Sequence, residues 1–146
     1  MDTFFQVSSI SQVIQLAVAP VFLLAGISGA LMVMSNRLGR IVDRGRYLKE
    51  SKKEADKEEI QSIREELNRL DTRANWTNWA ITLATACALL ICLVIVLLFL
   101  GAVLNFDATI LIACLFVVAM LCLSTAFILF LREIQMSTTA FQFHED

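Results

Sequence analysis

The chain has 146 residues, of which 58% are hydrophobic and 18% are charged. Soluble domains are about 45–50% apolar and about 25% charged, so this composition argues against a soluble globular protein. The formal net charge of −2 hides a strong asymmetry, because every Lys and Arg except Arg132 lies between Arg37 and Arg73.

Three apolar segments account for the excess of hydrophobic residues, at about residues 10–34, 79–104 and 108–131. Each can span a membrane, since about 20 helical residues cross a hydrocarbon core of about 30 Å. Cytoplasmic loops are enriched in Lys and Arg, so the basic segment between the first two spans should face the cytoplasm. We therefore expect a single multi-pass membrane domain over residues 1–146, with its N-terminus outside and its C-terminus in the cytoplasm.

The first apolar segment lacks the basic start of a signal peptide, so we expect it to be retained as a membrane helix. It contains small residues in pairs four positions apart, which allow membrane helices to approach closely. The pairs are Ala25 with Gly29 and Gly26 with Ala30. The second segment also repeats small residues every four positions, at Ala80, Ala84, Ala88 and Cys92. We expect this small-residue ridge to pack against the glycine face of the first helix.

The segment of about residues 36–75 is highly charged and contains no proline. Two runs in and beside it follow the alternating three- and four-residue spacing of a coiled coil. They are Met34, Leu38, Ile41, Gly45 and Leu48, and Ile60, Ile63, Leu67, Leu70 and Ala74. The runs predict a cytoplasmic antiparallel helical hairpin that extends from membrane helices one and two and turns between Lys49 and Asp56. Because no proline or glycine interrupts residues 50–100, the second arm should continue directly into the second span.

The two remaining boundaries are marked by single residues. Trp76 and Trp79 should lie where the second span enters the bilayer, because indole rings favour the headgroup region. Only a short connection separates the second and third spans, so these two helices should be antiparallel neighbours. Asp107, in that connection, is a good N-cap for the third helix.

The sequence shows no pattern of a catalytic or metal site. The single histidine, His144, lies in a polar segment beside Glu145 and Asp146. The cysteines all lie in apolar segments without a Cys-x-x-Cys pair, as expected of small buried residues. They are Cys87, Cys92, Cys114 and Cys122. We therefore expect no enzymatic activity, no metal, no cofactor and no nucleic-acid partner.

One face of the first helix is polar at its outer end, small in the middle, and polar and then basic at its inner end. This polar stripe comprises Ser8, Gln12, Gln15, Ala19, Phe22, Gly26, Gly29, Val33, Asn36 and Arg40. Polar side chains at membrane depth usually face a bundle interior or a water-filled cavity. In one interpretation, several copies of the helix surround a pore with Phe22 as its constriction. In the other, Gln12 caps the helix, Gln15 bonds to a neighbouring helix, and the glycines are packing contacts.

Four arginines follow the first span closely, namely Arg37, Arg40, Arg44 and Arg46. In one interpretation they bind anionic lipid headgroups, to which each would contribute about 1 kcal/mol near the membrane surface. They are also candidates for holding another anionic ligand. In the other interpretation they only determine topology and form salt bridges with acidic residues of the second arm, at Glu65, Glu66 and Asp71.

Residues 19–47 combine an apolar, glycine-containing helix with the pattern Asn-Arg-Leu-x-Arg-Ile-x-Asp-Arg-x-Arg. The positions of the pattern are Asn36, Arg37, Leu38, Arg40, Ile41, Asp43, Arg44 and Arg46. In this the chain resembles a bacterial membrane family catalogued as domain of unknown function 2721. The resemblance implies a bacterial inner-membrane location and carries over no activity.

The sequence therefore predicts an all-α integral membrane protein with lipid contacts. Several small-residue faces and the polar stripe predict that it associates with copies of itself. Two functions remain open. The first is a homo-oligomeric pore lined by the first helix. The second is a non-conducting scaffold or regulatory subunit whose hairpin docks a protein partner or anionic lipid.

Overall fold

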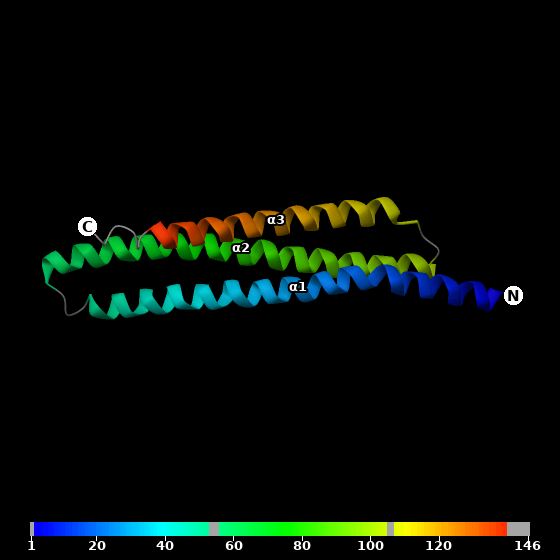
Figure 1. Ribbon diagram of the computed structural model, residues 1–146, viewed down its shortest axis with the longest axis horizontal. Helices are drawn as coiled ribbons and strands as arrows, with labels where there is room; N and C mark the ends of the chain where they lie inside the picture. Colours follow the sequence, from blue (N-terminus) through cyan, green and yellow to red (C-terminus); the bar gives the residue numbers. More distant parts are fainter. Residues whose placement is uncertain (1, 53–55, 105–106, 140–146) are drawn as a thin grey trace. The chain divides into compact units, whose positions relative to one another are not determined.

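The computed structural model contains three α-helices and no β-strand over the residues that it describes (Figure 1). Helix α1 spans Asp2–Ser51, α2 spans Lys57–Leu104 and α3 spans Thr109–Thr139. The structure describes residues 2–52, 56–104 and 107–139, with side chains for residues 11–12, 14–52, 56, 59–104 and 107–135. The predicted all-α fold is confirmed.

Each helix contains a segment long and apolar enough to span a membrane, as predicted. These segments lie within Ile14–Ser51, Glu59–Leu104 and Thr109–Gln135. Large apolar side chains are exposed on all three helices, among them Phe22, Val103 and Ile110. Soluble monomers rarely expose extended apolar surface, whereas lipid-facing helices require it. The chain thus has the construction of a multi-pass membrane protein.

The charged segments are continuous with the apolar ones. Helix α1 begins at Asp2, before the predicted boundary at residue 10, because no proline or glycine interrupts the preceding residues. Helix α2 carries the charged residues, both tryptophans and the apolar span without a break, as predicted. The end of α1 at Ser51 and the start of α2 at Lys57 agree with the predicted position of the turn.

The chain divides into two compact units, Met1–Ala30 with Leu83–Ser124 and Leu31–Thr82 with Thr125–Asp146. The buried core of the first unit takes residues from all three helices and Ala108, the residue before α3. They are Ala17, Ile27, Ala84, Cys87, Ile91, Val94, Ala108 and Ala119. The α2 members of this set alternate between steps of three and four residues. Such alternation keeps one face of a long helix turned toward its neighbours.

The predicted packing of the small-residue ridge against the glycines is wrong for the single chain. Within the first unit, Ala88 is only half-buried and Cys92 is exposed. A Cβ atom added to Gly26 or Gly29 would meet no other atom within 4 Å. The physical reason is that a four-residue repeat rotates about 40° around the helix at each step. The ridge therefore leaves the contact face within a few turns.

The second unit has a core where the ends of α1 and α2 pack together. Ile41 and Leu48 of α1 are buried with Leu70 of α2. Three further α2 side chains pack against them, namely Ile63, Leu67 and Ala74. These are positions of the two predicted runs. Burying a Leu or Ile side chain contributes about 1.5–3 kcal/mol, so this apolar contact does more than the surrounding exposed charges to hold the two helices together.

Helix α3 begins with a side-chain cap. The backbone N–H of Thr109 donates to Oδ1 of Asp107 at 3.1 Å, which confirms the predicted N-cap. Hydrogen bonds from Thr109, the side-chain one first, lower the pKa of Asp107 below its ordinary value of 3.8. The carboxylate form is therefore the one that caps the helix.

Candidate functional site

Glu133, near the end of α3, is a charged residue in the core of the second unit. Its side chain is only 1% exposed. It lies seven residues after Ala126, which is also buried, so both residues lie on the face of α3 that packs inward. A carboxylate at such a position must be paired, because an uncompensated buried charge is strongly destabilising.

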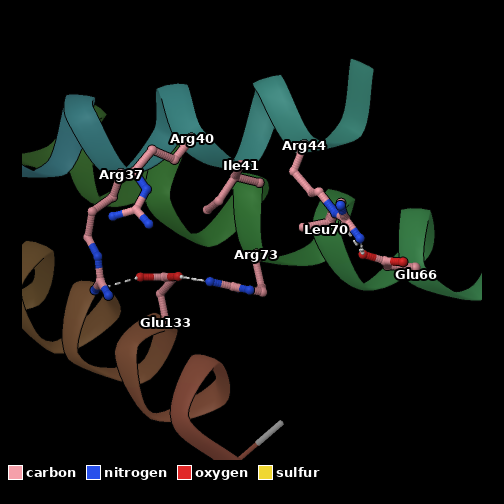
Figure 2. Close-up of a pocket in the computed structure, with 8 residues that line it drawn as sticks. All are labelled: Arg37, Arg40, Ile41, Arg44, Glu66, Leu70, Arg73 and Glu133. Atoms are coloured by element: carbon pink, nitrogen blue, oxygen red, sulfur yellow. Dashed lines mark hydrogen bonds and ion pairs between the residues drawn. The ribbon is translucent and has the colours of Figure 1, made fainter. Parts of the chain in front are cut away.

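Two arginines from different helices satisfy this carboxylate. Nη1 of Arg37 on α1 donates to Oε2 of Glu133 at 3.1 Å. Arg73 on α2 donates to Oε1 through Nη2 at 2.9 Å and through Nε at 3.3 Å. Glu133 therefore joins all three helices within the second unit (Figure 2).

A pocket of about 440 Å³ opens beside this cluster. Among the residues that the structure describes, Ile41 and Leu70 form the apolar part of its lining, and the other lining residues are charged. These are Arg37, Arg40, Arg44, Arg73, Glu66 and Glu133. Four positive and two negative side chains give this described lining a formal charge of +2. We call this site the arginine pocket.

Arg44 and Glu66 form the second ion pair of the arginine pocket. Nη2 and Nε of Arg44 lie 3.0 and 3.1 Å from Oε1 of Glu66. Both side chains are well exposed, at 52% and 44%. Exposed pairs of this kind typically contribute about 0.2–1 kcal/mol, so an anion from solution can displace Glu66 at little cost.

Arg40 is the cation that the pocket leaves without an acidic partner. The structure gives it no hydrogen bond or ion pair with any residue that it describes. Figure 2 shows its side chain directed into the same space as those of Arg37 and Glu133. A guanidinium group presents several N–H donors in a planar fork that matches phosphate and carboxylate oxygens. The arginine pocket is therefore suited to bind an anion.

The structure brings together three of the four arginines singled out in the sequence. Arg37, Arg40 and Arg44 line the arginine pocket, because steps of three and four residues place them on one face of α1. Arg46 lies on another face and lines a smaller pocket of about 190 Å³ with Lys49 and Asp71.

Of the predicted salt bridges to the second arm, the described residues contain only the pair Arg44–Glu66. Arg37 pairs with Glu133 instead. Glu65 and Asp71 are exposed and take part in none of the ion pairs of the described chain. The sequence analysis did not identify Arg73 and Glu133 as site residues. The one signal for Glu133 is its spacing of seven residues from Ala126, which places both residues on one face of a helix.

The polar stripe is exposed wherever its side chains are described. In the first unit its exposed members are Gln12, Gln15, Ala19, Phe22, Gly26 and Gly29. In the second unit they are Val33, Asn36 and Arg40. The side chain of Ser8 lies outside the described residues. The stripe is therefore not used for packing within either unit.

The described residues contain no group of three or more His, Cys, Asp or Glu side chains that could hold a metal ion. His144 lies outside them. The four cysteines are free thiols, of which Cys87 is buried, Cys122 is half-buried, and Cys92 and Cys114 are exposed.

Comparison with known proteins gives one match. The family described as "Protein of unknown function (DUF2721)" matches residues 17–143, which include both the apolar helices and the residues of the arginine pocket. No curated protein and no solved structure matches the chain.

Proposed function

The chain belongs to the family of proteins of unknown function DUF2721, and we propose that its arginine pocket binds the phosphate group of an anionic membrane lipid. Arg40 supports this most directly, because it is an exposed arginine without an acidic partner among the described residues, in a pocket whose described lining has a formal charge of +2. Phosphate-bearing headgroups offer the oxygen acceptors that its guanidinium lacks.

The position of the pocket along the helices favours a lipid over a soluble anion. On α1, Arg37 follows the apolar span and the buried Met34. On α2, Arg73 precedes Trp76 and the exposed Trp79. On α3, Glu133 ends an apolar segment. Because Arg37, Arg73 and Glu133 meet, the apolar segments of all three helices end at charged residues at one level of the second unit. Headgroups, and the tryptophans that accompany them, lie at such a level.

The concentration of Lys and Arg after the first span supports a cytoplasmic position for this level. Anionic lipids give the inner leaflet a negative potential. The attraction of each nearby arginine to this surface contributes about 1 kcal/mol to the binding free energy. In this proposal the protein is a lipid-binding component of the bacterial inner membrane, with its charged helix ends in the cytoplasm.

A lipid titration tests the proposal. The purified protein in detergent is titrated with phosphatidylglycerol or with phosphatidylcholine, and bound lipids are counted by native mass spectrometry. We expect phosphatidylglycerol to bind preferentially and Arg40→Gln to weaken its binding about fivefold.

Arg46→Gln is the matched control for this titration. It removes the same charge from the same helix outside the arginine pocket and should change binding little. If both variants weaken binding equally, general attraction to basic surface explains the binding, and the pocket is not the site.

A second candidate function is a homo-oligomeric pore lined by α1. The exposure of the polar stripe supports it, because Gln12 and Gln15 on an apolar helix are poorly suited to face lipid. In an assembly these side chains would line the outer mouth and Phe22 the constriction.

Ion flux into liposomes containing the protein tests this second candidate. The double variant Gln12→Leu with Gln15→Leu should abolish a flux carried by the pore. Absence of flux with the unaltered protein would favour a non-conducting scaffold, whose charged helix ends would dock a protein partner or lipid.

A further inference from the structure

We propose that the arginine pocket selects a ligand with two negative charges, such as a headgroup with two phosphates, over a single phosphodiester. This inference rests on the proposed function and adds the class of anion that the pocket prefers. It follows from how strongly each of the two internal carboxylates is held.

Glu133 is a fixed member of the pocket. It is buried and accepts three hydrogen bonds from two guanidinium groups. An incoming anion therefore cannot take its place without leaving a buried carboxylate unpaired. The two arginines and the one carboxylate of this cluster together carry a formal charge of +1.

Glu66 and Arg40 behave differently. Glu66 neutralises Arg44, but both are exposed, so their pairing is easily exchanged for another anion. Arg40, which has no acidic partner among the described residues, adds a second positive charge. A monoanion would leave one of the two positive charges unbalanced, whereas a dianion would balance both. Partly buried charges are screened less than exposed ones, so this difference should appear as affinity.

The geometry also offers two separate places for anionic groups. Arg37 uses only Nη1 toward Glu133, and its other N–H groups make no hydrogen bond with any described residue. Arg40 shares that end of the pocket. Arg44 lies one turn further along α1, about 6 Å along the helix axis from Arg40. The pocket of about 440 Å³ falls within the range of about 300–1,000 Å³ that is usual for small-molecule sites. Two phosphate groups can thus each take a guanidinium.

The test compares cardiolipin, which carries two phosphodiesters, with phosphatidylglycerol, which carries one. Binding of each to the purified protein is measured by native mass spectrometry, with phosphatidylcholine as the neutral reference. We expect cardiolipin to bind about fivefold more tightly than phosphatidylglycerol. Arg44→Gln should remove this advantage, whereas Arg46→Gln should keep it.

A competition arm separates the two sources of a dianion. Deacylated cardiolipin, which keeps both phosphodiesters and has no acyl chains, competes against bound phosphatidylglycerol. Displacement at the same concentration as cardiolipin would identify a soluble molecule with two phosphodiesters as sufficient, whereas displacement only by cardiolipin would identify the lipid. Either result supports the preference for a dianion if Arg44→Gln weakens the displacement, and a displacement that Arg44→Gln leaves unchanged overturns it.

Three further results would overturn the inference, and the third would also overturn the proposed function on which it rests. Equal affinity for cardiolipin and phosphatidylglycerol would refute the dianion preference and leave the proposed function intact, as would an advantage that survives Arg44→Gln. Equal affinity for phosphatidylglycerol and phosphatidylcholine would refute the proposed function itself.

Discussion

Nη1 of Arg37 lies 3.1 Å from Oε2 of Glu133, although the two residues are 96 positions apart in the sequence. The phenyl ring of Phe130, on the same helix as Glu133, lies 5.6 Å from the guanidinium carbon of Arg37. The ion pair and the cation–π contact hold the arginine against α3. Arg73 donates hydrogen bonds to the other oxygen of the same carboxylate. Arg37, Arg73 and Glu133 therefore form one rigid wall of the pocket.

Replacement of this carboxylate should be costly. Glu133→Gln removes the charge that compensates two partly buried arginines and should destabilise the protein by about 3–5 kcal/mol. Glu66→Gln is the matched control, since it breaks an exposed pair and should cost about 1 kcal/mol or less. Unfolding in detergent, followed by circular dichroism against denaturant, compares the two variants. Similar losses would contradict the distinction between a rigid and an exchangeable carboxylate.

The apolar contact between α1 and α2 should be equally sensitive. Leu70→Ala deletes a buried side chain at the centre of the cluster with Ile41 and Leu48 and should cost about 2–5 kcal/mol. Val42→Ala, on the exposed side of α1, should have little effect. The same unfolding assay measures both. A small effect of Leu70→Ala would mean that charges rather than apolar packing hold these helix segments together.

This contact was predictable, because alternating steps of three and four residues fix which face of a helix is buried. The sequence alone therefore identifies Leu48 and Leu70 as members of the buried faces. The predicted packing of the ridge from Ala80 to Cys92 against the first helix was wrong, because it was based on residue size alone. Residues four positions apart do not stay on one face of a helix, since each step rotates about 40° around the axis.

The site was predictable only in part. The sequence predicts that Arg37, Arg40 and Arg44 lie together, because they follow the apolar span and are spaced three and four residues apart. Glu133 was missed because a single acidic residue beside Arg132 resembles an ordinary helix end. Which arginines it pairs with depends on how α3 packs against α1 and α2, and local sequence does not encode that packing.

The glycines of the polar stripe allow a test of self-association. A Cβ at Gly26 meets no atom within 4 Å, so Gly26→Ala should be tolerated by the single chain and favour its helix by up to about 1 kcal/mol. If copies of α1 pack through this face, the larger Gly26→Leu should lower the oligomeric mass measured by light scattering. An unchanged mass would remove this face from any interface.

The cap of α3 should depend on pH. The pKa of Asp107 is lower in the folded protein than its ordinary value of 3.8, because hydrogen bonds from Thr109 favour the carboxylate. Its stabilising contribution is therefore fully present above that ordinary value and is lost as the pH falls through the lower, folded pKa. Carboxyl carbon NMR of Asp107 should give a pKa below 3.8.

Thr109→Val is the control for this titration. It removes the hydroxyl group and leaves the backbone N–H in place, so the pKa of Asp107 should rise toward its ordinary value. An unshifted Asp107 in the unaltered protein would mean that the cap is not formed in solution.

A structure of the protein in nanodiscs containing phosphatidylglycerol would show whether an anionic headgroup occupies the arginine pocket. We expect phosphate density within hydrogen-bonding distance of the Arg40 guanidinium. A well-resolved pocket that contains only water, with the lipid phosphates ordered elsewhere on the protein, would rule out the arginine pocket as the headgroup site.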